Sequence, residues 1–122
     1  MNTETDNRRR FDLEERTFRF AKSVIDFVDI LPKTVINNEI IKQVVRSSGS
    51  VGANYIEANE SISRKDYTFR VKVCRKEAKE TIYWLRLLNI KREEFSRTQQ
   101  DLIGEVTELM KIFGSIVEKV KE

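Results

Sequence analysis

Four stretches of the chain repeat apolar residues at steps of three and four, which places those residues on one side of a helix with about 3.6 residues per turn. The stripes predict helices over about 12–31, 37–59, 63–89 and 96–121. Strand-like alternation is absent. The pattern therefore predicts an all-α bundle of four helices, and the short connection near residues 60–63 favours antiparallel neighbours there. Residues 11–122 form a single domain in this interpretation, and residues 1–10 form a flexible basic tail.

The run from Ser63 to Asn89 organises the rest of the chain. Ser63 and Asp66 resemble a capping box, and neither proline nor glycine interrupts the run, so one continuous helix is expected. Its apolar side predicts core residues, listed as Tyr67, Val71, Cys74, Ala78, Thr81, Ile82, Leu85 and Leu88.

The opposite side of this helix carries a basic stripe, formed by Lys65, Lys72, Lys76, Lys79 and Arg86. Phe69 and Tyr83 fall in or beside the stripe, and Val73 and Trp84 lie between it and the core side. Aromatic residues are enriched where interfaces form, so another subunit or a ligand is expected to cover them. The alternative is that they are scattered surface residues of the kind found on any protein.

Positive charge is concentrated in the same region. Residues 64–92 hold ten Lys and Arg against three Asp and Glu, a net of +7, within a chain of net charge +3. Such a block is expected of a protein that binds nucleic acid or an acidic protein partner. The alternative is a solvated helix face with ion pairs such as Lys76 with Glu80.

The predicted second helix is rich in small residues over 46–54. A glycine inside a helix costs roughly 1 kcal/mol relative to alanine, so Gly49 and Gly52 suggest close contacts between helices, with a loop as the alternative. One outer face of this helix is formed by Arg46, Ser50, Ala53, Asn54 and Glu57. A structural ion pair or a contact between subunits fits Arg46 and Glu57 better than a catalytic pair does, because no nucleophile lies nearby in the sequence.

Composition disfavours an enzyme. The chain has no histidine, which removes the catalytic triads and the Glu-x-x-His pairs of di-iron bundles. We therefore predict no catalytic residues, no metal and no cofactor. The single cysteine, Cys74, has no partner for a disulfide within the chain. No apolar run is long enough to span a membrane and no signal-peptide pattern is present, so a soluble, cytoplasmic protein is expected.

The middle half of the chain resembles a known family. The segments RSSGSVGANYIEANESISRKDY and KEAKETIYWLRLL are similar to the four-helix-bundle proteins encoded in intervening sequences of bacterial 23S ribosomal RNA genes. The resemblance is close over about Arg46 to Leu88. The positions that carry it include the small residues between Ser47 and Ala53, together with Arg46, Asn54, Glu57, Glu80, Tyr83, Trp84 and Leu85.

The resemblance implies a left-handed, up-down-up-down bundle that assembles as a homopentamer. The same bundle is similar to the accessory variability determinant of diversity-generating retroelements, a basic pentamer that binds nucleic acid and a reverse transcriptase. The resulting hypothesis is a non-enzymatic homo-oligomer that binds RNA or DNA through the basic stripe, with a protein-interaction scaffold as the alternative. Its expected subunit interface consists of Arg46, Ser50, Ala53, Asn54, Glu57, Phe69, Val73 and Trp84.

Overall fold

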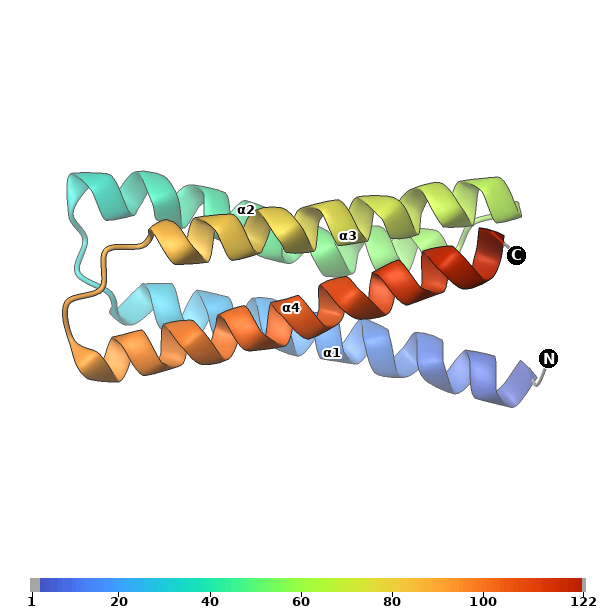
Figure 1. Ribbon diagram of the computed structural model, residues 1–122, viewed down its shortest axis with the longest axis horizontal. Helices are drawn as coiled ribbons and strands as arrows, with labels where there is room; N and C mark the ends of the chain where they lie inside the picture. The colour runs from blue at the N-terminus through green and yellow to red at the C-terminus, as the bar shows by residue number, and fades with distance from the viewer. Residues whose placement is uncertain (1–2, 122) are drawn as a thin grey trace.

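The protein is a bundle of four long helices in a computed structural model that describes residues 3–121, with side chains described for residues 8–120. The helices are α1 (Thr3–Ile30), α2 (Val35–Asn59), α3 (Arg64–Leu87) and α4 (Glu93–Lys121). The described part of the chain contains no strand, as the sequence pattern predicts. Figure 1 shows the four helices running along one long axis, each in the opposite direction to the one before it.

The bundle has two different ends. The α1–α2 and α3–α4 connections lie at one end, which we name the loop end, and the α2–α3 connection lies with the two chain termini at the other, which we name the terminal end (Figure 1). Each helix packs against two others, so that α1 and α3 both contact α2 and α4. The seam between α1 and α4 is the least extensive of the four. The two helices diverge toward the terminal end (Figure 1).

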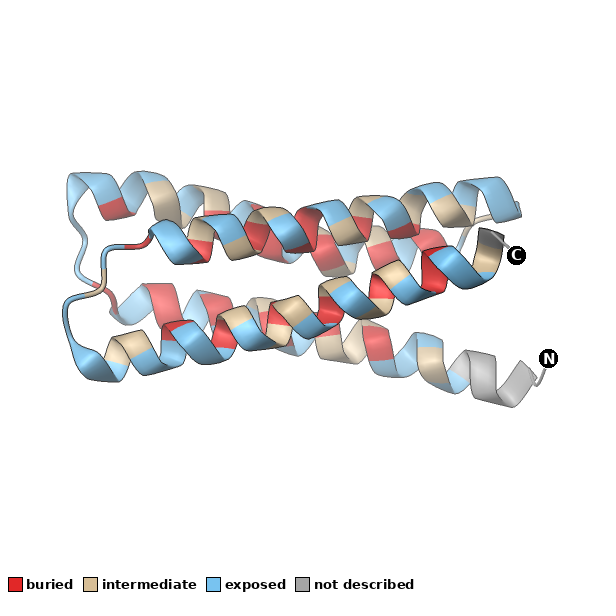
Figure 2. Cartoon of the chain, viewed as in Figure 1, coloured by how far each residue is buried: buried red, intermediate tan, exposed pale blue. Residues whose placement is uncertain are grey.

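The core fills the centre of the bundle, and Figure 2 shows buried positions recurring along the helices between exposed ones. The predicted inner side of α3 is confirmed, since Val71, Cys74 and Leu85 are fully buried. A contact between rings in the core joins Tyr55 of α2 to Phe113 of α4, with ring centroids 5.6 Å apart. Burial of this apolar surface is the main source of stability in a helical bundle.

Two predicted segments at the amino-terminal side differ from the structure. Helix α1 begins at Thr3, so residues 3–10 belong to a helix rather than to a flexible tail. No proline or glycine occurs before Pro32, and nothing in the sequence therefore stops the helix from extending in this direction. Helix α2 begins at Val35 and not near residue 37, because Thr34 is the cap and its hydroxyl accepts a hydrogen bond from the Asn37 amide.

The caps of the other two helices give one confirmation and one correction. The Ser63 hydroxyl accepts a hydrogen bond from the Asp66 amide at 3.1 Å, so the predicted cap of α3 is confirmed. Helix α4 begins at Glu93, three residues before the predicted start at residue 96, and the Ser96 amide donates to the Arg92 carbonyl. Glu93 and Glu94 lie in the first turn, where the helix dipole favours acidic side chains.

The glycines of α2 have different surroundings. The helix continues through residues 46–54, so the loop alternative is wrong. A Cβ placed on Gly52 would lie 2.9 Å from Oγ1 of Thr17 in α1, whereas one placed on Gly49 meets no other atom within 4 Å. Gly52 therefore permits the close approach of α1 and α2, and Gly49 has no such role within the chain.

Polar side chains join α1 to α4 and α2 to α3. Arg16 of α1 forms two hydrogen bonds of 2.8 Å with the carboxylate of Glu105 in α4. The Thr81 hydroxyl of α3 donates to the buried Ser47 hydroxyl of α2 at 2.8 Å.

Within residues 3–121, none of the helices is long and apolar enough to cross a membrane.

Candidate nucleic-acid interface

The basic stripe lies on the outer side of α3, opposite its buried residues. Lys65, Lys72, Lys76, Lys79 and Arg86 are all exposed, and we refer to these five residues as the basic face. Helix α3 holds them in register because it is continuous from Arg64 to Leu87. Among the described residues, no acid lies within ion-pair distance of any of the five.

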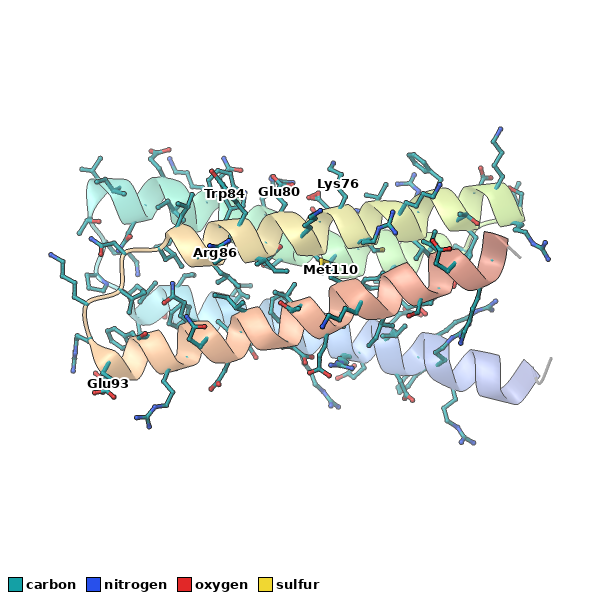
Figure 3. The ribbon with its side chains drawn as sticks, viewed as in Figure 1. Lys76, Glu80, Trp84, Arg86, Glu93 and Met110 are labelled. Atoms are coloured by element: carbon teal, nitrogen blue, oxygen red, sulfur yellow. The ribbon has the colours of Figure 1, made fainter. Side chains whose placement is uncertain are left out.

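Two of the three acids of α3, Glu77 and Glu80, pair with α2 and not with the basic face. Nη1 of Arg46 in α2 lies 3.3 Å from Oε1 of the buried Glu77. Nη2 of the same guanidinium lies 2.7 Å from Oε1 of Glu80. Desolvation alone would raise the pKa of Glu80, but hydrogen bonds with Arg46 and Trp84 outweigh it, and the pKa lies below its usual value. The Lys76–Glu80 ion pair considered from the sequence does not form in the structure. Figure 3 shows Lys76 and Glu80 projecting from α3 away from α4.

Two aromatic side chains lie among these cations. Phe69 is 60% exposed and Tyr83 is 55% exposed. The Tyr83 ring packs edge-on against Trp84, with centroids 5.0 Å apart, and the Trp84 indole N–H donates to Glu80 at 3.4 Å. Trp84 is half-buried and is held by contacts within the chain, whereas Phe69 and Tyr83 are exposed, with the Arg70 guanidinium 5.9 Å from the centroid of the Phe69 ring. Exposed rings between cations are typical of surfaces on which bases stack.

The expected interface residues of α2 are partly occupied by contacts within the chain. Asn54 donates to the Ser50 carbonyl and accepts a hydrogen bond from Arg70 of α3 at 3.1 Å. Arg46 forms ion pairs with Glu77 and Glu80. The structural ion pair that we considered for Arg46 therefore forms, but with these two residues and not with Glu57. Ala53 and Glu57 are exposed, and Val73 of α3 is half-buried.

A second exposed surface was missed in the sequence analysis. Phe11, Phe18 and Ile25 of α1 recur every seven residues and are 69%, 60% and 47% exposed. They lie on the flank of α1 next to α2, since Phe18 is one turn from Glu14, whose carboxylate accepts a hydrogen bond from Asn59 of α2. We name these three residues the α1 apolar stripe. Their seven-residue spacing, out of phase with the core stripe, was the signal that could have identified it.

The single thiol lacks the surroundings of a reactive cysteine. Cys74 is fully buried in the centre of α3, and desolvation raises its pKa to about 12. The protonated thiol is a poor nucleophile and metal ligand. Cys74 therefore packs as a small apolar residue.

The fold and this surface define an all-α four-helix bundle with an uncompensated basic face on its third helix. The family model described as 23S rRNA-intervening sequence protein matches residues 9–115. The chain belongs to this family. It is also similar to a crystal structure from Bacteroides thetaiotaomicron, described as a protein of unknown function from the S23 ribosomal protein family. That likeness has a TM-score of 0.72 and 29% identity over 89% of this chain and 97% of the other. No curated protein matches the chain.

Proposed function

We propose that this protein is a non-enzymatic homo-oligomer that binds single-stranded regions of RNA or DNA through the basic face of α3. The observation that carries the proposal is the set of five exposed cations without a described acidic partner, with Phe69 and Tyr83 between them. Lysines of this kind neutralise phosphates and release counterions, and exposed rings stack on bases without regard to sequence. Recognition would therefore follow the nucleic-acid backbone and not its base sequence.

Self-association is the second part of the proposal, including the left-handed bundle and pentameric ring implied by the family resemblance. The α1 apolar stripe supports it, because a row of large apolar side chains on a surface helix marks an interaction site more often than a solvated face. A ring would repeat the basic face once per subunit and so increase affinity for a long strand. A role as accessory to a reverse transcriptase is a further proposal within the same function.

The nucleic-acid part is tested by replacing Lys72, Lys76 and Lys79 together with glutamine. We measure fluorescence anisotropy of a labelled single-stranded RNA over a range of salt concentrations. The slope of log affinity against log salt should become shallower by about 2, since each phosphate contact on a single strand contributes about 0.7. The matched control replaces Lys22, Lys42 and Lys111, three exposed lysines outside the basic face.

The control variant has the same net charge but should retain most of the wild-type affinity. Equal losses of RNA affinity in the two variants would mean that only the overall charge matters. They would refute a specific role of the basic face in binding. If the wild-type protein binds no RNA at low salt, the basic face would instead fit an acidic protein partner, which a pull-down that survives nuclease treatment would identify.

The oligomer part is tested by light scattering. One chain has a mass of 14.4 kDa, so a mass several times larger is expected for the wild type. Phe18→Glu places a charge in the α1 apolar stripe and should reduce the mass toward that of one chain. Ser23→Glu adds the same charge at an exposed position of the same helix and should leave the mass unchanged. A wild-type monomer would contradict this part of the proposal.

A further inference from the structure

The terminal end of the bundle contains a cavity separate from the outer side of α3. Its volume is about 500 Å³. It lies between the amino-terminal part of α1, the α2–α3 connection, the start of α3 and the last turns of α4. The side chains that matter most for its chemistry are those of Arg9, Arg10, Asn59, Arg64, Tyr67 and Lys119.

The described charged residues that line this cavity are all positive. Arg9 and Arg10 reach it from α1, Arg64 from α3 and Lys119 from α4, and no described lining residue is acidic. None of these four cations forms an ion pair with a described acid. Three separate helices thus bring uncompensated positive charge to one concave site, where the field of each adds to that of the others.

Buried polar atoms without partners lie beside the same cavity. Tyr55 is 0% exposed, and its hydroxyl makes no hydrogen bond in the structure. The Asn59 side chain lies one turn further along α2, donates to Glu14 and leaves its own Oδ1 without a partner. Arg9 Nε is also buried and unpaired. An unsatisfied buried polar group costs roughly 1–3 kcal/mol, so three at one place require an explanation.

The protonation state of Tyr55 makes it a donor. Burial raises its pKa, and Tyr67 raises it further, while the Asn59 side chain and, more weakly, Arg9 and Arg10 lower it. Tyr55 does not itself line the cavity, and its hydroxyl lies behind Asn59 and Tyr67, which do. A neutral phenol at physiological pH donates a hydrogen bond and adds no negative charge that would repel an anion.

We propose that this cavity binds a phosphate group, held by Arg9, Arg64 and Lys119, with the neutral Tyr55 hydroxyl behind its wall. Guanidinium groups form paired hydrogen bonds with phosphate oxygens, and Arg9 Nε is a buried donor that the protein itself leaves unused. Ser63 at the rim keeps its hydroxyl hydrogen, because its oxygen accepts from the Asp66 amide. The phosphate belongs either to a small phosphorylated molecule or to the end of a nucleic-acid strand.

Calorimetric titration with inorganic phosphate tests the site directly. We expect saturable binding of one phosphate per chain. Arg64→Gln and Lys119→Gln should each weaken it about tenfold, because each removes a charge-assisted hydrogen bond. Arg9→Gln removes the buried Nε donor that the protein leaves unpaired and should weaken binding by a similar factor. Lys91→Gln, an exposed change at the loop end, is the matched control and should have no effect.

The two sources of the phosphate are separated by a second titration, with oligonucleotides that carry either a terminal phosphate or a terminal hydroxyl. Preference for the phosphorylated strand assigns the site to strand ends, and equal binding of the two strands together with phosphate binding assigns it to a small molecule. The variant without Lys72, Lys76 and Lys79 should bind inorganic phosphate like the wild type. The phosphate site can therefore be tested even if the proposed function is wrong. No saturable phosphate binding, or equal weakening by Lys91→Gln, would overturn the proposal.

Discussion

Buried polar side chains are hydrogen-bonded at the loop end of the bundle, whereas several leave an atom unpaired at the terminal end. At the loop end, Asn37 joins the start of α2 to the segment after α3, since its side-chain oxygen accepts from the Asn89 amide at 3.2 Å and its amide nitrogen donates to the Asn89 carbonyl at 3.4 Å. Buried Gln99 of α4 donates to the Leu85 carbonyl at 2.7 Å. At the terminal end, Tyr55, Asn59 and Arg9 each leave a buried polar atom unpaired.

This difference separates structural polar groups from groups available to a ligand. The loop end must fix two connections, and a paired amide in a low-dielectric interior is strong and specific. Within residues 3–121, unpaired buried side-chain atoms are found at the terminal end alone, next to the basic cavity. The comparison therefore predicts that polar substitutions at the loop end destabilise the fold, and that those at the terminal end change binding instead.

The largest effect should come from the apolar core that supports the loop end. Leu85→Ala removes a fully buried side chain of α3 beside the Gln99 contact and should lower the free energy of unfolding by roughly 2–5 kcal/mol. Urea denaturation followed by circular dichroism measures it. Leu87→Ala, two residues further and 46% exposed, is the control and should change stability by less than about 0.5 kcal/mol. Similar losses of unfolding free energy in the two variants would mean that the assignment of the buried and exposed sides of α3 is wrong.

Breaking the amide link at the loop end should have the next largest effect. Asn37→Ala leaves the Asn89 amide without its acceptor and should lower the free energy of unfolding by roughly 1–3 kcal/mol. Its neighbour Asn38 is exposed, so Asn38→Ala is a control with the same change of side chain. The two variants are compared in the same urea titration, and a stability loss in Asn38→Ala as large as in Asn37→Ala would remove the special role of the link.

A pair of glycine substitutions tests the middle of the α1–α2 seam, between the two ends. Gly52→Ala forces a methyl group against Thr17, whose hydroxyl is already bonded to the Leu13 carbonyl, and should destabilise the protein by about 1–3 kcal/mol. Gly49→Ala has free space and should stabilise it by about 0.4–1 kcal/mol. Melting temperatures that shift in the same direction for both variants would contradict the close approach at Gly52.

The smallest stability effect is expected at the terminal end. Tyr55→Phe removes a hydroxyl that has no partner and keeps the ring against Phe113, so the free energy of unfolding should change by less than about 0.5 kcal/mol. Urea denaturation in buffer without phosphate provides the measurement. A loss of more than about 1 kcal/mol would indicate that the hydroxyl has a structural partner and that the two ends do not differ.

The helices and their core could be predicted because each depends on residues close together in the sequence. The spacing of Val71, Cys74 and Leu85 predicted the inner side of α3, and Ser63 with Asp66 predicted its start. Helix starts were less certain, since several residues near the start of α2 and of α4 could serve as caps. Thr34 is the cap of α2, although the later asparagines are equally suitable by residue type.

Contacts between distant residues could not be predicted from local patterns. The basic face was visible as a stripe on one helix, but its lack of neutralising acids depends on Arg46, which comes from another helix and holds Glu77 and Glu80. The terminal cavity brings together Arg9, Arg64 and Lys119, which follow one another at intervals of nearly half of the chain. Its unpaired atoms become evident only once the packing around Tyr55 is known.

The difference between the two ends is tested most directly by amide chemical-shift mapping of the full-length protein during titration with inorganic phosphate. We predict saturable shifts at the terminal end, around Asn59, Ser61 and Tyr67, and none at the loop end, around Asn89 and Gln99. Shifts spread equally over both ends, or confined to the loop end, would contradict the assignment of the unpaired groups to a ligand.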